Sequence, residues 1–155
     1  MMQWKVGFKH AVTQLLCYCM LLVLISLPSL GFTQSLDKDV ILESLSGKPG
    51  DAARGRIIIL SRQTGLCILC HSGPFPEERF QGNLAPDLAV SAARLSKQQL
   101  RARIVDASQF NPDTIMPSYY RKEHFTRVAP QYSGKSILSA QDIEDVVEFL
   151  VSIKP

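Results

Sequence analysis

The motif Cys67-Ile68-Leu69-Cys70-His71 limits the folds that are open to this chain. Two cysteines three residues apart lie on one side of a helical turn, so both thiols can reach the two vinyl groups of one porphyrin. The histidine that follows is then held beneath the iron. The motif therefore predicts one covalently attached haem c on Cys67 and Cys70, with His71 as an iron ligand.

Three other interpretations of the cysteine pair are less consistent with the rest of the sequence. A structural zinc ion needs four ligands, and no second pair of cysteines or histidines stands in a suitable place. A thioredoxin-like dithiol needs a strand-rich βαβ setting, which the sequence lacks. A disulfide across two intervening residues would close only a very small loop. Haem attachment is favoured over all three.

The start of the chain has the three-part pattern of a secretory signal peptide. Lys5 and Lys9 give a basic opening, and residues 11–30 form an apolar run without any charge. We expect residues 1–33 to be a signal peptide, with cleavage near 31–34. A retained membrane anchor is the alternative, because a spanning helix needs ~20 apolar residues. In either case the folded part would lie outside the cytoplasm. After cleavage the protein would be periplasmic, without stable membrane insertion.

Removal of this leader simplifies the search for further iron ligands. Met116 becomes the one remaining methionine, and His71 and His124 become the only histidines. The charge falls to 15 basic against 14 acidic residues, since the leader takes two lysines with it. A balance so close to neutral gives no support for nucleic-acid or membrane binding.

Two side chains are candidates for the second axial ligand. Met116 precedes Pro117 in a predicted loop, where a rigid extended backbone can direct the thioether at the metal. His124 follows the charged residues 121–123, a pattern typical of a solvated surface. We favour Met116. With both axial positions filled, oxygen or substrate could not bind, and the haem would pass single electrons.

The periodicity of the mature chain predicts helices and no convincing strands. Helices are expected in four places: within 35–50, from the cap Asp51 to Arg62, from a capping box at Ser96 and Gln99, and from the cap Ser139 to Val151. The run Ile57–Leu60 could, taken alone, also be a strand. Residues 72–87 hold three prolines and two glycines and are expected to be loop. The predicted fold class is all-α, with long loops around one covalent haem.

Beyond the haem motif, the sequence resembles the SoxX family, the smaller cytochrome subunits of the SoxAX complexes of bacterial sulfur oxidation. The resemblance extends from about Gly50 to Leu150. It rests on CILCH at 67–71, on LRARIVDASQFNPDTIMPSYYR at 100–121, and on RVAPQYSGKSILSAQDIEDVVEFL at 127–150. It implies a class I cytochrome c-like domain at 51–155, preceded by an N-terminal extension at 34–50.

The resemblance also implies roles for individual residues. His71 would be the proximal iron ligand and Met116 the distal one. Pro86 matches the proline whose carbonyl accepts a hydrogen bond from the proximal histidine in cytochromes of this fold. Gly55 and Phe149 match the glycine and the aromatic residue at which the first and last helices cross.

The implied function is electron transfer within a thiosulfate-oxidising complex. SoxAX-type complexes couple thiosulfate oxidatively to a cysteine of a carrier protein, SoxYZ, and catalysis is placed in the larger SoxA subunit. A SoxX-like chain would pair with a SoxA-like chain, accept the released electrons and pass them to a downstream cytochrome, without a catalytic site of its own. A freely diffusing monohaem cytochrome and a haem-based gas sensor are the alternatives.

The middle of the chain is basic. The residues concerned are Arg94, Lys97, Arg101, Arg103, Arg121, Lys122 and Arg127. They could form a docking face or neutralise the haem propionates, but for most of them an ordinary solvated helix face is expected.

Overall fold

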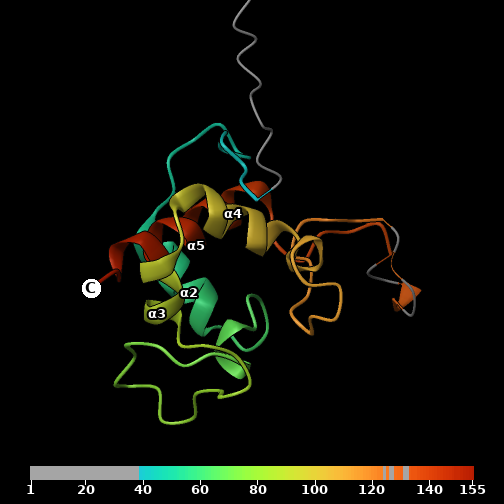
Figure 1. The fold of residues 1–155 in the computed structure, drawn as a ribbon. Coiled ribbons are helices and arrows are strands. Elements are labelled where there is room, and N and C mark those ends of the chain that lie inside the picture. Colours follow the sequence, from blue (N-terminus) through green and yellow to red (C-terminus); the bar gives the residue numbers. More distant parts are fainter. Residues whose placement is uncertain (1–38, 124, 126–127, 131–132) are drawn as a thin grey trace, which may run out of the picture. The chain divides into compact units, whose positions relative to one another are not determined.

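Helices and connecting loops make up the described part of the computed structural model, which comprises residues 39–123, 125, 128–130 and 133–155 (Figure 1). The helices are α2 (Ala52–Leu60), η1 (Cys67–Leu69), α3 (Leu88–Arg94), α4 (Lys97–Val105), η2 (Ala107–Gln109) and α5 (Ala140–Ser152), where η marks a short 3-10 helix. Within these residues the one strand-like pairing is an isolated parallel bridge between His71 and Ala85. The predicted all-α fold class is confirmed.

Two predictions concern residues outside this part of the chain. The signal peptide at 1–33 and the alternative ligand His124 both lie outside the described residues. No helix among the described residues combines the length and the apolar character needed to cross a bilayer.

Local capping signals place three of the α-helices where the sequence predicts them. The carboxylate of Asp51 accepts hydrogen bonds from the first backbone N–H groups of α2. Ser96 and Gln99 form a reciprocal capping box at the start of α4, and Ser139 and Asp142 form another at the start of α5. Each box satisfies N–H groups that the helix itself leaves unpaired. These predictions are confirmed.

The prediction of a short helix within residues 35–50 is wrong for residues 39–50, the part of this segment that the structure describes. Residues 39–50 form bends and extended chain. The N–H of Leu45 donates to the carboxylate of Glu144 on α5 (2.9 Å), and the carbonyl of Ile41 accepts from Arg101 on α4 (2.6 Å). Distant side chains therefore satisfy backbone groups that a helix would pair internally.

A helix that the sequence did not predict, α3, follows the proline-rich loop. The loop at 72–87 is confirmed, and its last residue, Asp87, caps α3 by accepting a hydrogen bond from the N–H of Ala89 (2.8 Å). Leu88 and Ala92 are buried. Seven residues give too few turns for a clear period of 3.6, so only the cap could have indicated this helix.

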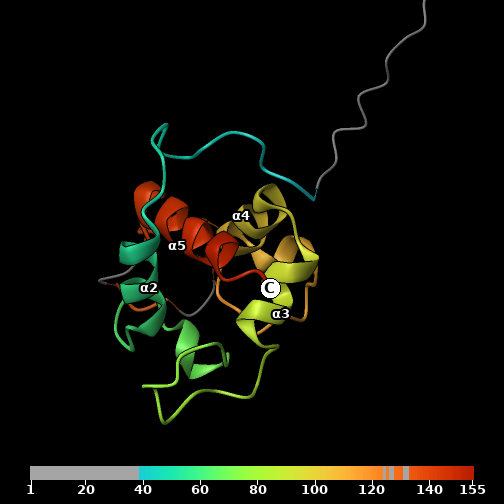
Figure 2. The ribbon, with the colours of Figure 1, turned by 90° about the vertical axis from the view of Figure 1, so that its left-hand side faces the viewer.

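Helix α5 is central to the packing. It contacts α2, α3 and α4, and Figure 2 shows α2 on one side of it and α4 with α3 on the other. At Gly55 a Cβ atom would overlap the backbone carbonyl of Asp145, so only glycine allows α2 to approach α5 so closely. The ring of Phe149 stacks on Phe75, with 5.8 Å between the ring centroids.

Two adjacent carboxylates of α5 also hold the helices together. Glu144 receives two hydrogen bonds from the guanidinium of Arg101 (2.8 and 2.9 Å), and both side chains are almost fully buried. Burial alone would raise the pKa of the Glu144 carboxyl, but the hydrogen bonds from Arg101 and from the N–H of Leu45, together with the positive charges of Arg101 and Lys97, outweigh it and the pKa is lowered. Asp145 receives hydrogen bonds from Arg54 on α2 and from the N–H of Asp51 (2.7 Å).

Candidate haem site

The cysteine–histidine motif occupies η1 and the two residues that follow it. Leu66 leads into η1 with a left-handed φ of 62°. The N–H groups of Cys70 and His71 both bond to the carbonyl of Cys67, at 3.1 and 2.9 Å. This single tight turn carries both cysteines, which are free thiols in the structure.

His71 is held by the loop that leads to α3. Its Nδ1 lies 2.6 Å from the carbonyl oxygen of Pro86. The bridge between His71 and Ala85, together with a hydrogen bond from Ala85 N–H to the carbonyl of Cys70 (2.9 Å), aligns the two segments. Because a carbonyl oxygen can only accept, Nδ1 carries the proton, and Nε2 retains the lone pair that binds a metal.

A cavity of about 330 Å³ brings the predicted site residues together. Cys67, His71, Pro86 and Met116 all line it, although they come from three separate segments of the chain. Most of the remaining wall is apolar and includes Ile59, Leu88, Leu100, Ile104, Leu138 and Leu150. Cys70 is half-buried and is not part of this lining.

Tyr119 contributes to the site without having been predicted. Its hydroxyl donates a hydrogen bond to the carbonyl of Gly65 (2.6 Å) and lies 4.0 Å from Sγ of Cys67. Burial raises the pKa of the Cys67 thiol to about 11, against the opposing effect of the hydrogen bond with Tyr119. Redox-active dithiols need the opposite, a lowered thiol pKa. This environment therefore does not suit a thioredoxin-like role for Cys67.

The residues present fit a haem. An apolar wall, a thiol at the lining, an imidazole with a free Nε2 and a thioether supply the groups that a covalently held macrocycle with two axial ligands needs. The lining also contains Arg103, a cation whose Nη1 is buried and has no hydrogen-bond partner among the described residues. The described residues contain no group of three or more His, Cys, Asp or Glu side chains that could hold a metal ion.

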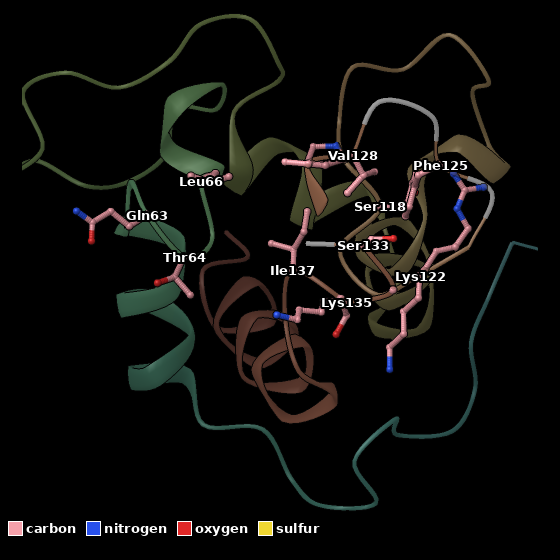
Figure 3. Close-up of a pocket in the computed structure, with 15 residues that line it drawn as sticks. Gln63, Thr64, Leu66, Ser118, Lys122, Phe125, Val128, Ser133, Lys135 and Ile137 are labelled. Atoms are coloured by element: carbon pink, nitrogen blue, oxygen red, sulfur yellow. The ribbon is translucent and has the colours of Figure 1, made fainter. Parts of the chain in front are cut away.

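A larger cavity, of about 1130 Å³, lies beside the segments that flank the site. Figure 3 shows Thr64 and Leu66 along one wall, with Ser118, Lys122 and Lys135 coming from the segments that follow Met116. Its described lining contains no thiol, imidazole or thioether. This cavity is the larger of the two, but the smaller one has the side chains that a haem needs, so we take the smaller one as the candidate haem site.

The basic residues of the middle segment have different surroundings. Lys97 forms a surface ion pair with Glu148, as a solvated helix face predicts. That expectation is wrong for Arg101, which is buried against Glu144. It also fails to describe Arg103, which lines the cavity. Nothing in the sequence distinguishes these two arginines, because both follow the same capping box on the same helix.

The helical architecture, with its first and last long helices crossing at a glycine and the motif beside an apolar cavity, is that of the class I cytochromes c. Among solved structures, the chain is similar to the crystal structure of SoxXA from P. pantotrophus. The TM-score is 0.70 and the identity 35%, and the match covers 76% of this chain and 92% of that chain. The chain belongs to the SoxXA family of cytochromes. A scan against models of protein families and a search of curated proteins found no match.

Proposed function

We propose that this chain is the SoxX-type electron-transfer subunit of a SoxAX complex and carries one covalent haem c. The observation that carries the proposal is the convergence of Cys67, His71 and Met116 on one apolar cavity, in a chain 35% identical to a SoxXA structure. A haem, when bound, supplies one-electron oxidation and reduction of its iron.

Each site residue has a separate task in this proposal. Cys67 and Cys70 form the thioether bonds, so the domain retains its cofactor without a deep binding cavity. His71 would bind the iron through Nε2, and the hydrogen bond to the carbonyl of Pro86 would fix the orientation of its ring. Met116 would be the second protein ligand, and its thioether would keep the potential higher than a second histidine would.

With His71 and Met116 both bound to the iron, the haem would have no position for thiosulfate or oxygen. The chain itself would then only pass electrons. Coupling thiosulfate to a cysteine thiol of a SoxYZ-like carrier forms one sulfur–sulfur bond and releases one proton and two electrons. A SoxA-like partner would catalyse that step. This subunit would take up the electrons one at a time and pass them to a downstream cytochrome, all in the periplasm.

The proposal is tested by expressing the chain with cytochrome c maturation enzymes, alone and together with a SoxA-like chain. We expect red protein that keeps its haem after acid–acetone extraction, and co-elution of the two chains. Cys67→Ala and Cys70→Ala should each weaken covalent retention. Colourless extracted protein would refute the haem assignment. Separate elution of the two chains would refute the subunit assignment and favour a freely diffusing cytochrome.

A further inference from the structure

Arg103 on α4 is the starting point, because its environment is unusual for a guanidinium. It lines the haem cavity, and its Cζ lies 4.4 Å from the centroid of the Phe110 ring. Its Nη1 is buried and has no hydrogen-bond partner. Arg101, two residues earlier on the same helix, instead places two nitrogens on the carboxylate of Glu144.

The unpartnered nitrogen needs an explanation, because a buried charge without a counter-ion is costly. Stacking on Phe110 engages the face of the guanidinium but leaves the in-plane N–H groups unpaired. The ionisable groups that share the described lining are Cys67, His71, Arg94 and Tyr119. None of them is a carboxylic acid, so this wall does not supply the missing anion.

A haem brings acidic groups of its own, namely two propionates on one edge of an otherwise apolar ring. A guanidinium binds a carboxylate through two parallel hydrogen bonds, which suits a planar fork held in place by an aromatic ring. We propose that Arg103 binds a haem propionate and that its positive charge raises the reduction potential of the iron. Arg94, exposed where it lines the same cavity, is the second cation on this side. The inference rests on the proposed function, since it requires the haem.

The direction of the effect on the potential follows from electrostatics. Ferric haem carries one more positive charge than ferrous haem, so a nearby guanidinium disfavours the ferric state. In a cavity with mostly apolar walls this interaction is screened less than at the surface. Removing the charge of Arg103 should therefore lower the reduction potential of the iron. Removing an exposed charge outside the cavity should leave this potential unchanged.

The experiment compares Arg103→Gln with Arg62→Gln in the purified, haem-loaded protein. Arg62 is the control because it is exposed and lies outside the cavity lining. It makes a long surface ion pair with Glu78 (3.8 Å) and donates a hydrogen bond to the carbonyl of Phe80. We expect Arg103→Gln to lower the potential in a redox titration and to shift the propionate bending band in the resonance Raman spectrum. Arg62→Gln should leave both at their wild-type values.

A conservative variant separates charge from hydrogen-bond geometry. Arg103→Lys keeps the charge, so its potential should stay closer to wild type than that of Arg103→Gln. Its propionate band should still be shifted, because an ammonium group lacks the planar fork. If the glutamine variant does not fold, an unshifted band in Arg103→Lys overturns the inference. In folded Arg103→Gln, a potential and band equal to those of the control overturn it and leave the proposed function standing. Wild-type protein without covalent haem overturns both.

Discussion

Asp106→Asn should destabilise the protein in a way that depends on pH. The side chain of Asp106 is buried behind the segment that carries Met116, and it is surrounded by donors. It accepts hydrogen bonds from the hydroxyls of Ser108 and Ser118 and from the amide of Gln109 (3.0 Å). Arg121 adds an ion pair at 3.2 Å. The ionised carboxylate thus ties η2 to the side chain of Ser118, two residues beyond Met116.

The magnitude follows from the pKa of this carboxyl. Burial by itself would raise the pKa of Asp106, but the hydrogen bonds from Ser108, Ser118 and Gln109 outweigh it and lower the pKa from 3.8 to about 2. Because the pKa in the folded state is below that of the unfolded chain, the carboxylate stabilises the fold at neutral pH. This contribution disappears as the pH falls from about 4 towards 2. At about 1.4 kcal/mol per pKa unit, it amounts to roughly 2.5 kcal/mol.

The assay is urea unfolding of the haem-loaded wild type and of Asp106→Asn at a series of pH values. We expect the variant to lose about 2.5 kcal/mol of unfolding free energy at pH 7. The two proteins should converge in stability as the solution is acidified. Asp113→Asn is the control, because Asp113 is exposed in the loop that follows η2. A loss that is the same at every pH, or no larger than that of the control, would refute the reasoning.

Three further substitutions test the axial ligand, the helix crossing and the buried ion pair. Met116→Ala should abolish the weak near-red sulfur-to-iron absorption of the ferric protein and lower its potential; an unchanged spectrum would move the assignment to His124. Gly55→Ala should cost about 1–3 kcal/mol or more, because its methyl group overlaps the backbone of α5, and an unaltered melting temperature would contradict this. Arg101→Met should cost about 3–5 kcal/mol in urea unfolding, because it leaves a buried carboxylate without its partner. Adding Glu144→Leu should recover much of that loss, and a double variant no more stable than Arg101→Met would argue against the ion pair.

The parts of the fold that the sequence predicts are those governed by local contacts. Ser96 and Ser139 satisfy N–H groups three residues away, so their helices can be located from a short window of sequence. Residues 39–50 differ from the predicted helix because Arg101 and Glu144, which lie far along the chain, satisfy part of their backbone. Within this segment Leu45 packs against the core, and Leu42 is largely exposed.

The same distinction applies to the site. Cys67 and His71 belong to one contiguous motif. Tyr119 is brought to the site only by the fold, where its hydroxyl donates a hydrogen bond to the carbonyl of Gly65, two residues before the motif. Arg103 shows most clearly what the sequence alone does not reveal about the site. Its sequence context is that of an ordinary charged helix, and only the tertiary structure shows that the side chain lines the cavity and that its Nη1 is buried without a partner.

The crossing of α2 with α5 affects the order of events during biosynthesis. In the proposed export to the periplasm, the chain would leave the translocation channel N-terminus first, and its cysteine pair would emerge well before residues 140–152. Until then α2 has no helix to close against, and the core stays incomplete. During this interval Cys67 would lack the packing that surrounds it in the folded domain. The machinery that installs a haem would therefore have its best access before the last helix arrives.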